Sequence, residues 1–120
     1  MKTIFSMVLF FFICNMSAQT SAELIGKWQL VKWTHNGKEK SLVDTFKTDQ
    51  VFQLFKPDGK FESIVGDEVH HSKWKLSKDN KELTIVSALL PIKFTIDYFD
   101  AKKRIITHDT MGTLEYKKVE

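Results

Sequence analysis

The four histidines are the residues in this sequence best suited to metal binding or proton transfer. His70 and His71 are adjacent, and neighbouring residues of a strand point to opposite faces, so this pair cannot hold one ion together. His35 and His108 stand alone, and zinc sites usually combine closely spaced cysteine and histidine ligands. Only a tertiary cluster such as His71, His108 and Asp109 would bring several ligands together. The pattern therefore predicts ordinary polar surface, with no metal and no cofactor.

The hydroxyl and carboxyl side chains give no catalytic pattern either. The serines fall on expected strands and turns, without a nucleophile elbow or a phosphate-cradling loop. Asp97 stands out because it interrupts an aromatic run, although its position places it on the polar face of that run. Paired carboxylates of glycoside hydrolases converge only in three dimensions, so their spacing in sequence is uninformative. We therefore expect a protein that is not an enzyme.

Aromatic side chains are the remaining candidates, and they suit binding better than catalysis. The chain has 10 Phe, 3 Trp and 2 Tyr, and six of these rings are expected to face a shared interior and to contact a small apolar ligand. The alternative is a core that the rings simply fill, which short strands favour, since a barrel of about eight strands is just wide enough for side chains or one small ligand. The candidate lining residues are Trp28, Phe55, Phe61, Trp74, Phe94 and Tyr98.

Regular turn signals and alternating residues indicate the strands that would position these rings. Asn36 with Gly37, and Pro57 with Gly59, are typical of tight turns. Between such turns, apolar and polar residues alternate with the period of a half-buried strand. Short connections join antiparallel neighbours, because a parallel return needs a longer crossover. The expected strands cover 27–35, 50–56, 60–66, 69–77, 82–88, 92–99, 104–109 and 113–119.

This pattern predicts an all-β fold. A small antiparallel up-and-down meander of about eight strands, closing into a β-barrel, would cover the apolar faces and remove the exposed edges. A two-layer sandwich is the alternative. Ser41 is a candidate cap for one short helix near 41–47 that carries Leu42, Val43 and Phe46; otherwise this stretch is a crossing loop or strand.

The first residues predict a signal peptide rather than part of the fold. Lys2 gives a positive start, residues 4–13 are almost entirely apolar, and small and polar residues follow. An apolar run of about ten residues is half of what a membrane-spanning helix needs, and no later segment is longer. We place the signal peptide at 1–19, with cleavage after Ala18 or Gln19, and expect no transmembrane segment in the mature protein.

The remaining residues, 20–120, predict one exported domain, periplasmic or extracellular. A form anchored through a lipid on Cys14 is less favoured, because Ile13 stands where lipid attachment needs a small residue. The formal net charge is +3 and the lysines are scattered, whereas nucleic-acid binding needs a concentrated basic stripe. The short basic run 102–104 therefore indicates a solvated turn, and we expect no nucleic-acid partner.

Three stretches of the sequence resemble the bacterial lipocalin-like domains of small exported proteins. Residues 24–30 contain the Gly-x-Trp signature, Gly26 and Trp28, that opens the first strand in the lipocalin and fatty-acid-binding superfamily. Residues 55–61 form an aromatic–turn–aromatic hairpin, and residues 74–83 a strand–turn–strand that starts with Trp. Together with the strand order, these stretches cover most of the chain after the leader.

The resemblance implies a lipocalin-like β-barrel with a bias toward small apolar ligands. In such families Gly26 lets the chain enter the barrel closely, Trp28 plugs its closed end, and Arg104 stacks on that tryptophan as a structural signature. The sequence departs from full-size lipocalins in its shorter length and in lacking their disulfide and C-terminal helix. Because fold alone does not establish function, these departures leave the ligand undefined.

Two functions remain open from the sequence. The first is an exported binding protein that holds a small hydrophobic ligand in the barrel. The alternative is a protein- or envelope-interaction module with a filled core and no ligand cavity, which would use exposed apolar segments. The sequence does not define the oligomeric state. The segments to compare are Leu42, Val43 and Phe46, and the pair Leu89 and Leu90, which would favour the first function if they pack over the barrel mouth.

Overall fold

The computed structural model of the protein describes residues 21–88 and 90–120. Within these ranges, the expected domain forms one barrel. Several predictions concern residues outside these ranges. They are the signal peptide at 1–19, its cleavage after Ala18 or Gln19, the lipid anchor on Cys14, and the packing of Leu89 over the barrel mouth.

Nine strands of the described chain form one sheet, and eight of them follow the predicted ranges to within two residues. The strand that was not predicted is β2, whose three residues are all exposed and show no apolar alternation. It forms because Asn36 and Gly37 both have positive φ, 53° and 77°, which returns the chain along β1. The strands are β1 (Gly26–His35), β2 (Lys38–Lys40), β3 (Val51–Phe55), β4 (Lys60–Val65), β5 (Glu68–Leu76), β6 (Glu82–Ser87), β7 (Leu90–Phe99), β8 (Lys103–His108) and β9 (Gly112–Lys118).

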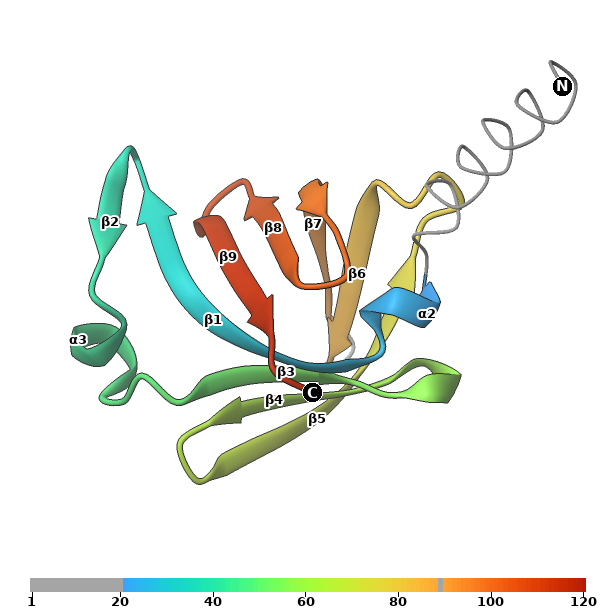
Figure 1. Ribbon diagram of the computed structural model, residues 1–120, viewed down its shortest axis with the longest axis horizontal. Coiled ribbons are helices and arrows are strands. Elements are labelled where there is room, and N and C mark those ends of the chain that lie inside the picture. Colours follow the sequence, from blue (N-terminus) through green and yellow to red (C-terminus); the bar gives the residue numbers. More distant parts are fainter. Residues whose placement is uncertain (1–20, 89) are drawn as a thin grey trace, which may run out of the picture.

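The sheet closes on itself through β1. One edge of β1 pairs with β3 and, near its end, with β2, while the other edge pairs with β9, so β1 and β3–β9 form a closed barrel of eight strands. Figure 1 shows β6–β9 rising beside β1, with β3–β5 crossing below them. All neighbouring strands are antiparallel and follow chain order apart from the β2 extension. The predicted all-β meander that closes into a barrel is confirmed, and the sandwich is excluded.

Alternate residues of the strands build the core inside this barrel. On β3 and β4, for example, the paired residues Phe55 and Phe61 are both buried, while their neighbours along the strands are more exposed. The buried apolar residues are Leu24, Trp28, Leu30, Val51, Phe55, Phe61, Trp74, Leu83, Ile85, Phe94, Ile106, Leu114 and Tyr116.

A bulge in β7 reverses the side on which its last residues lie. The register with β8 shifts between Ile96 and Tyr98, so one extra residue, Asp97, stands between them. A one-residue slip moves the following side chains to the opposite face. Phe99 therefore faces the interior, where its ring lies 5.9 Å from that of Trp28. The prediction that Tyr98 lines the barrel is wrong: its side chain is 47% exposed and its hydroxyl donates to Asp100 over 2.6 Å.

A similar bulge in β1 keeps a second tryptophan inside. The register with β9 shifts between Leu30 and Lys32, which leaves Val31 as the extra residue, 39% exposed. Leu30 pairs with Tyr116 before the bulge, and Trp33 pairs with Leu114 after it. Both positions consequently face the interior, although simple alternation would place them on opposite sides.

Among the described residues, two short α-helices lie at the ends of the barrel, and a 3-10 turn, η1 (Pro57–Gly59), precedes β4. α2 (Ser21–Leu24) precedes β1, and α3 (Leu42–Phe46) lies between β2 and β3 (Figure 1). The Ser41 side chain accepts a hydrogen bond from the Asp44 backbone N–H over 3.2 Å, and Lys47 ends α3 in the left-handed conformation. The short helix predicted near 41–47 is therefore confirmed.

Candidate binding site

The closed end of the barrel is built around Arg104 and Trp28, both fully buried. The guanidinium carbon of Arg104 lies 5.0 Å from the centre of the Trp28 ring and 4.3 Å from that of Tyr116. The Trp28 indole N–H donates to the backbone carbonyl of Leu24 over 2.8 Å, which ties α2 to this end. Flat aromatic faces attract a cation, so the cluster holds the arginine in place. This is the position that the resemblance implied for the two signature residues.

Arg104 is a buried cation without an anion beside it. Its Nη2 donates to Oε1 of Gln53 over 2.7 Å, and its Nε and Nη1 have no hydrogen-bond partner among the described residues. Burial lowers the pKa of Arg104 to about 10, so the side chain stays charged at neutral pH. Burial also raises the pKa of Tyr116 to about 12, against the opposing attraction of the Arg104 charge. The interior beside Gln53 is therefore positively polarised.

Gly26, the other signature residue, lies where the two ends of the domain meet. Its φ of 135° belongs to a region that side chains disfavour, and a Cβ there would stand 2.4 Å from the backbone oxygen of Glu120. That oxygen accepts a hydrogen bond from the Lys27 N–H over 3.0 Å. Glycine is thus required for the C-terminal residues to approach β1.

The opposite end contains a cavity of about 300 Å³, which we call the mouth cavity. α3 covers it: Phe46 contributes to the lining, and its ring lies 6.0 Å from that of Trp33. The Trp33 indole N–H donates to the Met111 carbonyl over 2.6 Å, which fixes the loop between β8 and β9 at the same opening. Short strands favoured a filled core, but this half of the barrel contains a partly open cavity. The wall includes Leu30, Trp33, Phe46, Val51, Val65, Met111 and Leu114.

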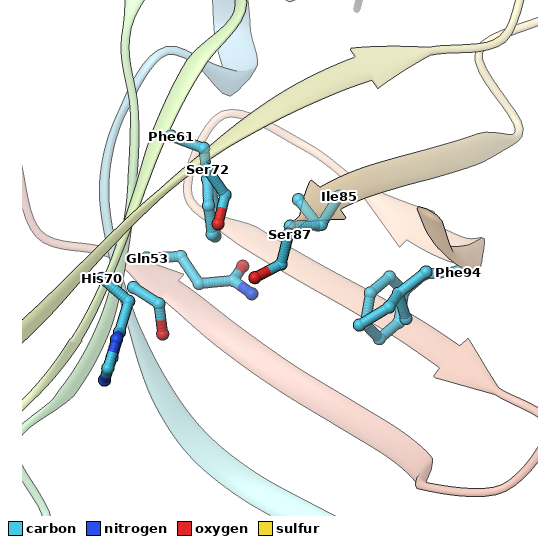
Figure 2. Close-up of a pocket in the computed structure, with 9 residues that line it drawn as sticks. Gln53, Phe61, His70, Ser72, Ile85, Ser87 and Phe94 are labelled. Atoms are coloured by element: carbon cyan, nitrogen blue, oxygen red, sulfur yellow. The ribbon is translucent and has the colours of Figure 1, made fainter. Parts of the chain in front are cut away.

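A second cavity of about 340 Å³, the side cavity, opens between β5 and the β6–β7 hairpin. Residues 68–72 of β5 pair only with β4, because the pairing of β5 with β6 starts at Lys73 and Val86. Figure 2 shows polar side chains from both sides of this opening around the cavity. The two cavities share Gln53, Ser63 and Phe94 in their walls. The side cavity is lined by Gln53, Phe61, Ser63, His70, Ser72, Ile85, Ser87, Ile92 and Phe94.

The six candidate aromatic residues separate into three groups. Trp28, Phe55 and Trp74 belong to the packed closed end, where the Phe55 and Trp74 rings meet edge to face at 5.5 Å. Phe61 packs on Phe55 and also reaches the side cavity, while Phe94 lines both cavities. Tyr98 lies outside the barrel, as described above. Phe94 is thus the candidate that both cavities share.

Several residues of the cavity walls, Trp33 and Gln53 among them, were not predicted from the sequence. Trp33 was hidden by the bulge at Val31, whereas Phe46 had been named among the residues that could pack over the barrel mouth, and its docking is a tertiary contact. Gln53 had a usable signal, since it stands two residues from both Val51 and Phe55 on an otherwise apolar face. A polar residue at such a position needs a buried partner, which here is Arg104.

The histidines do not assemble into a metal site. His70 faces the side cavity, whereas the outward-facing His71 lies 3.4 Å from Glu62. The His108 Nδ1 accepts hydrogen bonds from the backbone N–H groups of Thr110 and Met111. Within residues 21–88 and 90–120, no group of three or more His, Cys, Asp or Glu side chains is placed to hold an ion, so the conceivable cluster with Asp109 does not form.

Asp97, the acid singled out from the sequence, lies at the bulge of β7. It is exposed on the outer face, and it accepts a hydrogen bond from the hydroxyl of Thr107 on β8. Its surroundings therefore give it a structural contact across the sheet.

Among the described residues, no helix has the length and apolar character needed to cross a bilayer.

Comparison with known proteins gives structural neighbours only. No family model matches the sequence, and no curated protein matches it. A lipocalin-like protein from Bacteroides uniformis ATCC 8492 superposes with a TM-score of 0.64 at 18% identity, covering 81% of this chain and 99% of that one. An uncharacterised protein from Bacteroides eggerthii DSM 20697 gives 0.62 at 18% identity, covering 79% and 98%.

A third neighbour, a DUF4847 family protein from Bacteroides vulgatus ATCC 8482, has a TM-score of 0.53 at 13% identity and covers 79% of this chain and 94% of that one. At such identities the likeness establishes the fold alone. The molecule is a small, closed, antiparallel up-and-down barrel. More specifically, it has the fold of a bacterial lipocalin-like domain, as the resemblance in its sequence implied.

Proposed function

We propose that this chain is an exported binding protein that holds a small, largely apolar molecule in the mouth cavity. The observation that carries the proposal is the volume of about 300 Å³ beneath α3. Ligand pockets in proteins start at about this size and are lined mainly by apolar and aromatic residues. Trp33, Phe46 and Met111 give the mouth cavity this character.

α3 has the properties of a lid in this proposal. Leu42 and Phe46 pack against the core, while Val43 on the other side of the helix is 53% exposed. The helix has five residues and leaves the barrel strands free to stay paired when it moves. A ligand would therefore enter by displacing one short helix rather than by opening the sheet.

Export is the part of the proposal that rests on residues 1–19. Their order of positive, apolar and small residues is that of a secretory signal. Fractionation of cells that express the full chain is expected to place the processed protein in the periplasm or medium, with Gln19 or Thr20 at its N-terminus. Retention of the unprocessed chain in the cytoplasm would contradict export without affecting the binding proposal.

Filling the mouth cavity tests the binding proposal directly. Val65 lines this cavity on β4, so Val65→Phe should occupy part of its volume. We expect N-phenylnaphthylamine, a neutral apolar dye, to bind the wild-type protein and to bind this variant at least about tenfold more weakly, the scale of a lost apolar contact. Val69→Phe is the matched control, because Val69 is 45% exposed at the start of β5. Absence of dye binding to the wild-type protein would refute the proposal.

The interaction module remains the second candidate. Leu42 and Phe46, two of the residues considered for it, pack inward, which favours the lid instead. The observation that favours this candidate is the exposure of Leu90, at 69%, on the β6–β7 hairpin. Capture of a specific envelope protein that is lost on Leu90→Ser, together with no dye binding, would favour this alternative.

A further inference from the structure

The side cavity differs in character from the mouth cavity. Five hydrogen-bonding side chains line it from four strands: Gln53 on β3, Ser63 on β4, His70 and Ser72 on β5, and Ser87 on β6. Figure 2 shows Gln53, Ser72 and Ser87 reaching into the same space. The rest of the wall is apolar, from Phe61, Ile85, Ile92 and Phe94, so the cavity adds several hydrogen-bonding groups for a polar part of a ligand to an apolar surface.

The two cavities are neighbours inside the barrel. Gln53, Ser63 and Phe94 belong to both walls, so each cavity reaches these three side chains. The opening of the side cavity lies where residues 68–72 of β5 have no partner on β6. A molecule with an apolar chain under α3 would thus place its other end between β5 and the β6–β7 hairpin.

The charge of Arg104 selects the kind of polar group that fits. The Arg104 Nη2 donates to Oε1 of Gln53, which leaves the Nε2 amide hydrogens of Gln53 free to donate to a ligand. No carboxylate contacts the guanidinium among the described residues, so its charge is uncompensated in a medium of low dielectric. A negative group next to Gln53 would be stabilised by this charge and by the polarised amide.

The exposed acid Glu68 lies beside His70, one of the residues that line the side cavity. Glu68 lies with its Oε2 3.6 Å from the Nε2 of His70, and both side chains are exposed. Exposed charges are screened by water and salt, whereas the buried Arg104 is not. Glu68 therefore repels a bound anion less strongly than Arg104 attracts it.

From these contacts we propose that the side cavity binds the anionic head, a carboxylate or a phosphate, of an amphiphile whose apolar chain occupies the mouth cavity. The inference rests on the proposed binding function and names the class of ligand. Gln53 is its specificity-determining residue, because it joins the buried charge to the ligand. The serine hydroxyls of Ser63, Ser72 and Ser87 supply the remaining donors.

The test compares ligands that differ only in the head. Decanoate, decyl phosphate and decanol compete for bound N-phenylnaphthylamine at neutral pH. At least one of the two anions is expected to bind about tenfold or more tightly than decanol, the scale of a charge-assisted hydrogen bond. Comparing the affinities for decanoate and decyl phosphate shows whether the site prefers a carboxylate or a phosphate.

Gln53→Glu is the most informative variant. It keeps the shape of the side chain, gives Arg104 a counter-charge and places a negative charge at the head site. We expect a higher melting temperature and loss of the preference for anions over decanol. A merely structural role of Gln53 would raise stability without changing the preference.

Ser72→Ala with Ser87→Ala forms a second variant that leaves the Arg104 contact intact. Its preference for the anion should fall about tenfold, while Thr95→Ala, which removes an exposed hydroxyl from β7, should leave the preference unchanged. Equal binding of anions and decanol by the wild-type protein, or an unchanged preference in both the Gln53 and the serine variants, overturns the inference while the binding function stands. If neither dye nor decanol nor anion binds, the proposed function fails and the inference fails with it.

Discussion

Arg104 shows how one residue determines the character of the interior. A buried arginine is expensive to desolvate, and burial lowers its pKa to about 10 although it remains charged. Three aromatic rings and Gln53 surround it, and none of these groups is an anion. The residue therefore stabilises the stack at the closed end and also sets a positive field beside the two cavities.

Gly26 provides a prediction at the scale of the residue. In Gly26→Ala the new Cβ would meet the Glu120 oxygen and disturb its hydrogen bond with Lys27, in a backbone conformation that disfavours side chains. We expect a loss of about 2–4 kcal/mol in the free energy of unfolding, measured with urea.

Gly37→Ala is the control for this prediction. Gly37 also has a positive φ, of 77°, but no atom lies within 4 Å of an added Cβ, so only backbone strain of about 1 kcal/mol remains. Equal losses in the two variants would show that the approach of the C-terminal residues to β1 does not contribute to stability.

At the scale of the element, α3 is the segment that we propose to control access to the mouth cavity. Its cap at Ser41 and its left-handed end at Lys47 define five helical residues, too few for a helix that is stable by itself. Its position depends on the contacts of Leu42 and Phe46 with the core. Such an element can open locally at a lower cost than the barrel.

Phe46→Ala should loosen this lid. The ring of Phe46 contacts Trp33 and lines the cavity, so its removal is expected to speed dissociation of N-phenylnaphthylamine severalfold in stopped-flow measurements. Val43→Ala on the exposed side of the same helix should leave the rate unchanged. Equal rates in the two variants would contradict the role of α3 as a lid.

Strand pairing distinguishes two regions of the whole molecule. β1 and β9 close the barrel through six paired positions, whereas residues 68–72 of β5 pair on one side only. The described domain contains no cysteine, so its packing and this pairing hold it together. Local stability should consequently be high along β1 and β9 and low at the side opening.

Hydrogen exchange measures this difference. The amides of residues 68–72 that point away from β4 are expected to exchange at least about a hundredfold faster than those in the β1–β9 ladder. Saturation with decanoate should slow the exchange of these amides if its head fills the side cavity. Uniform protection around the barrel would contradict an opening between β5 and β6.

Local patterns in the sequence were sufficient to predict the elements. Period-two alternation and turn residues such as Asn36 and Gly37 located eight strands, because each strand shows one face to the core. Ser41 indicated the short helix through its capping chemistry. These features depend on residues close together in the chain, so the sequence alone determined the all-β class, the strand order and much of the core.

Only the tertiary structure decided which faces meet in the candidate binding site. The bulges at Val31 and Asp97 depend on register with β9 and β8, and each reverses the side of the residues that follow, as Trp33 and Tyr98 show. The contact of Gln53 with Arg104 joins residues 51 positions apart. Barrel closure brings such residues together through long-range pairing, and short-range periodicity carries no information about that register.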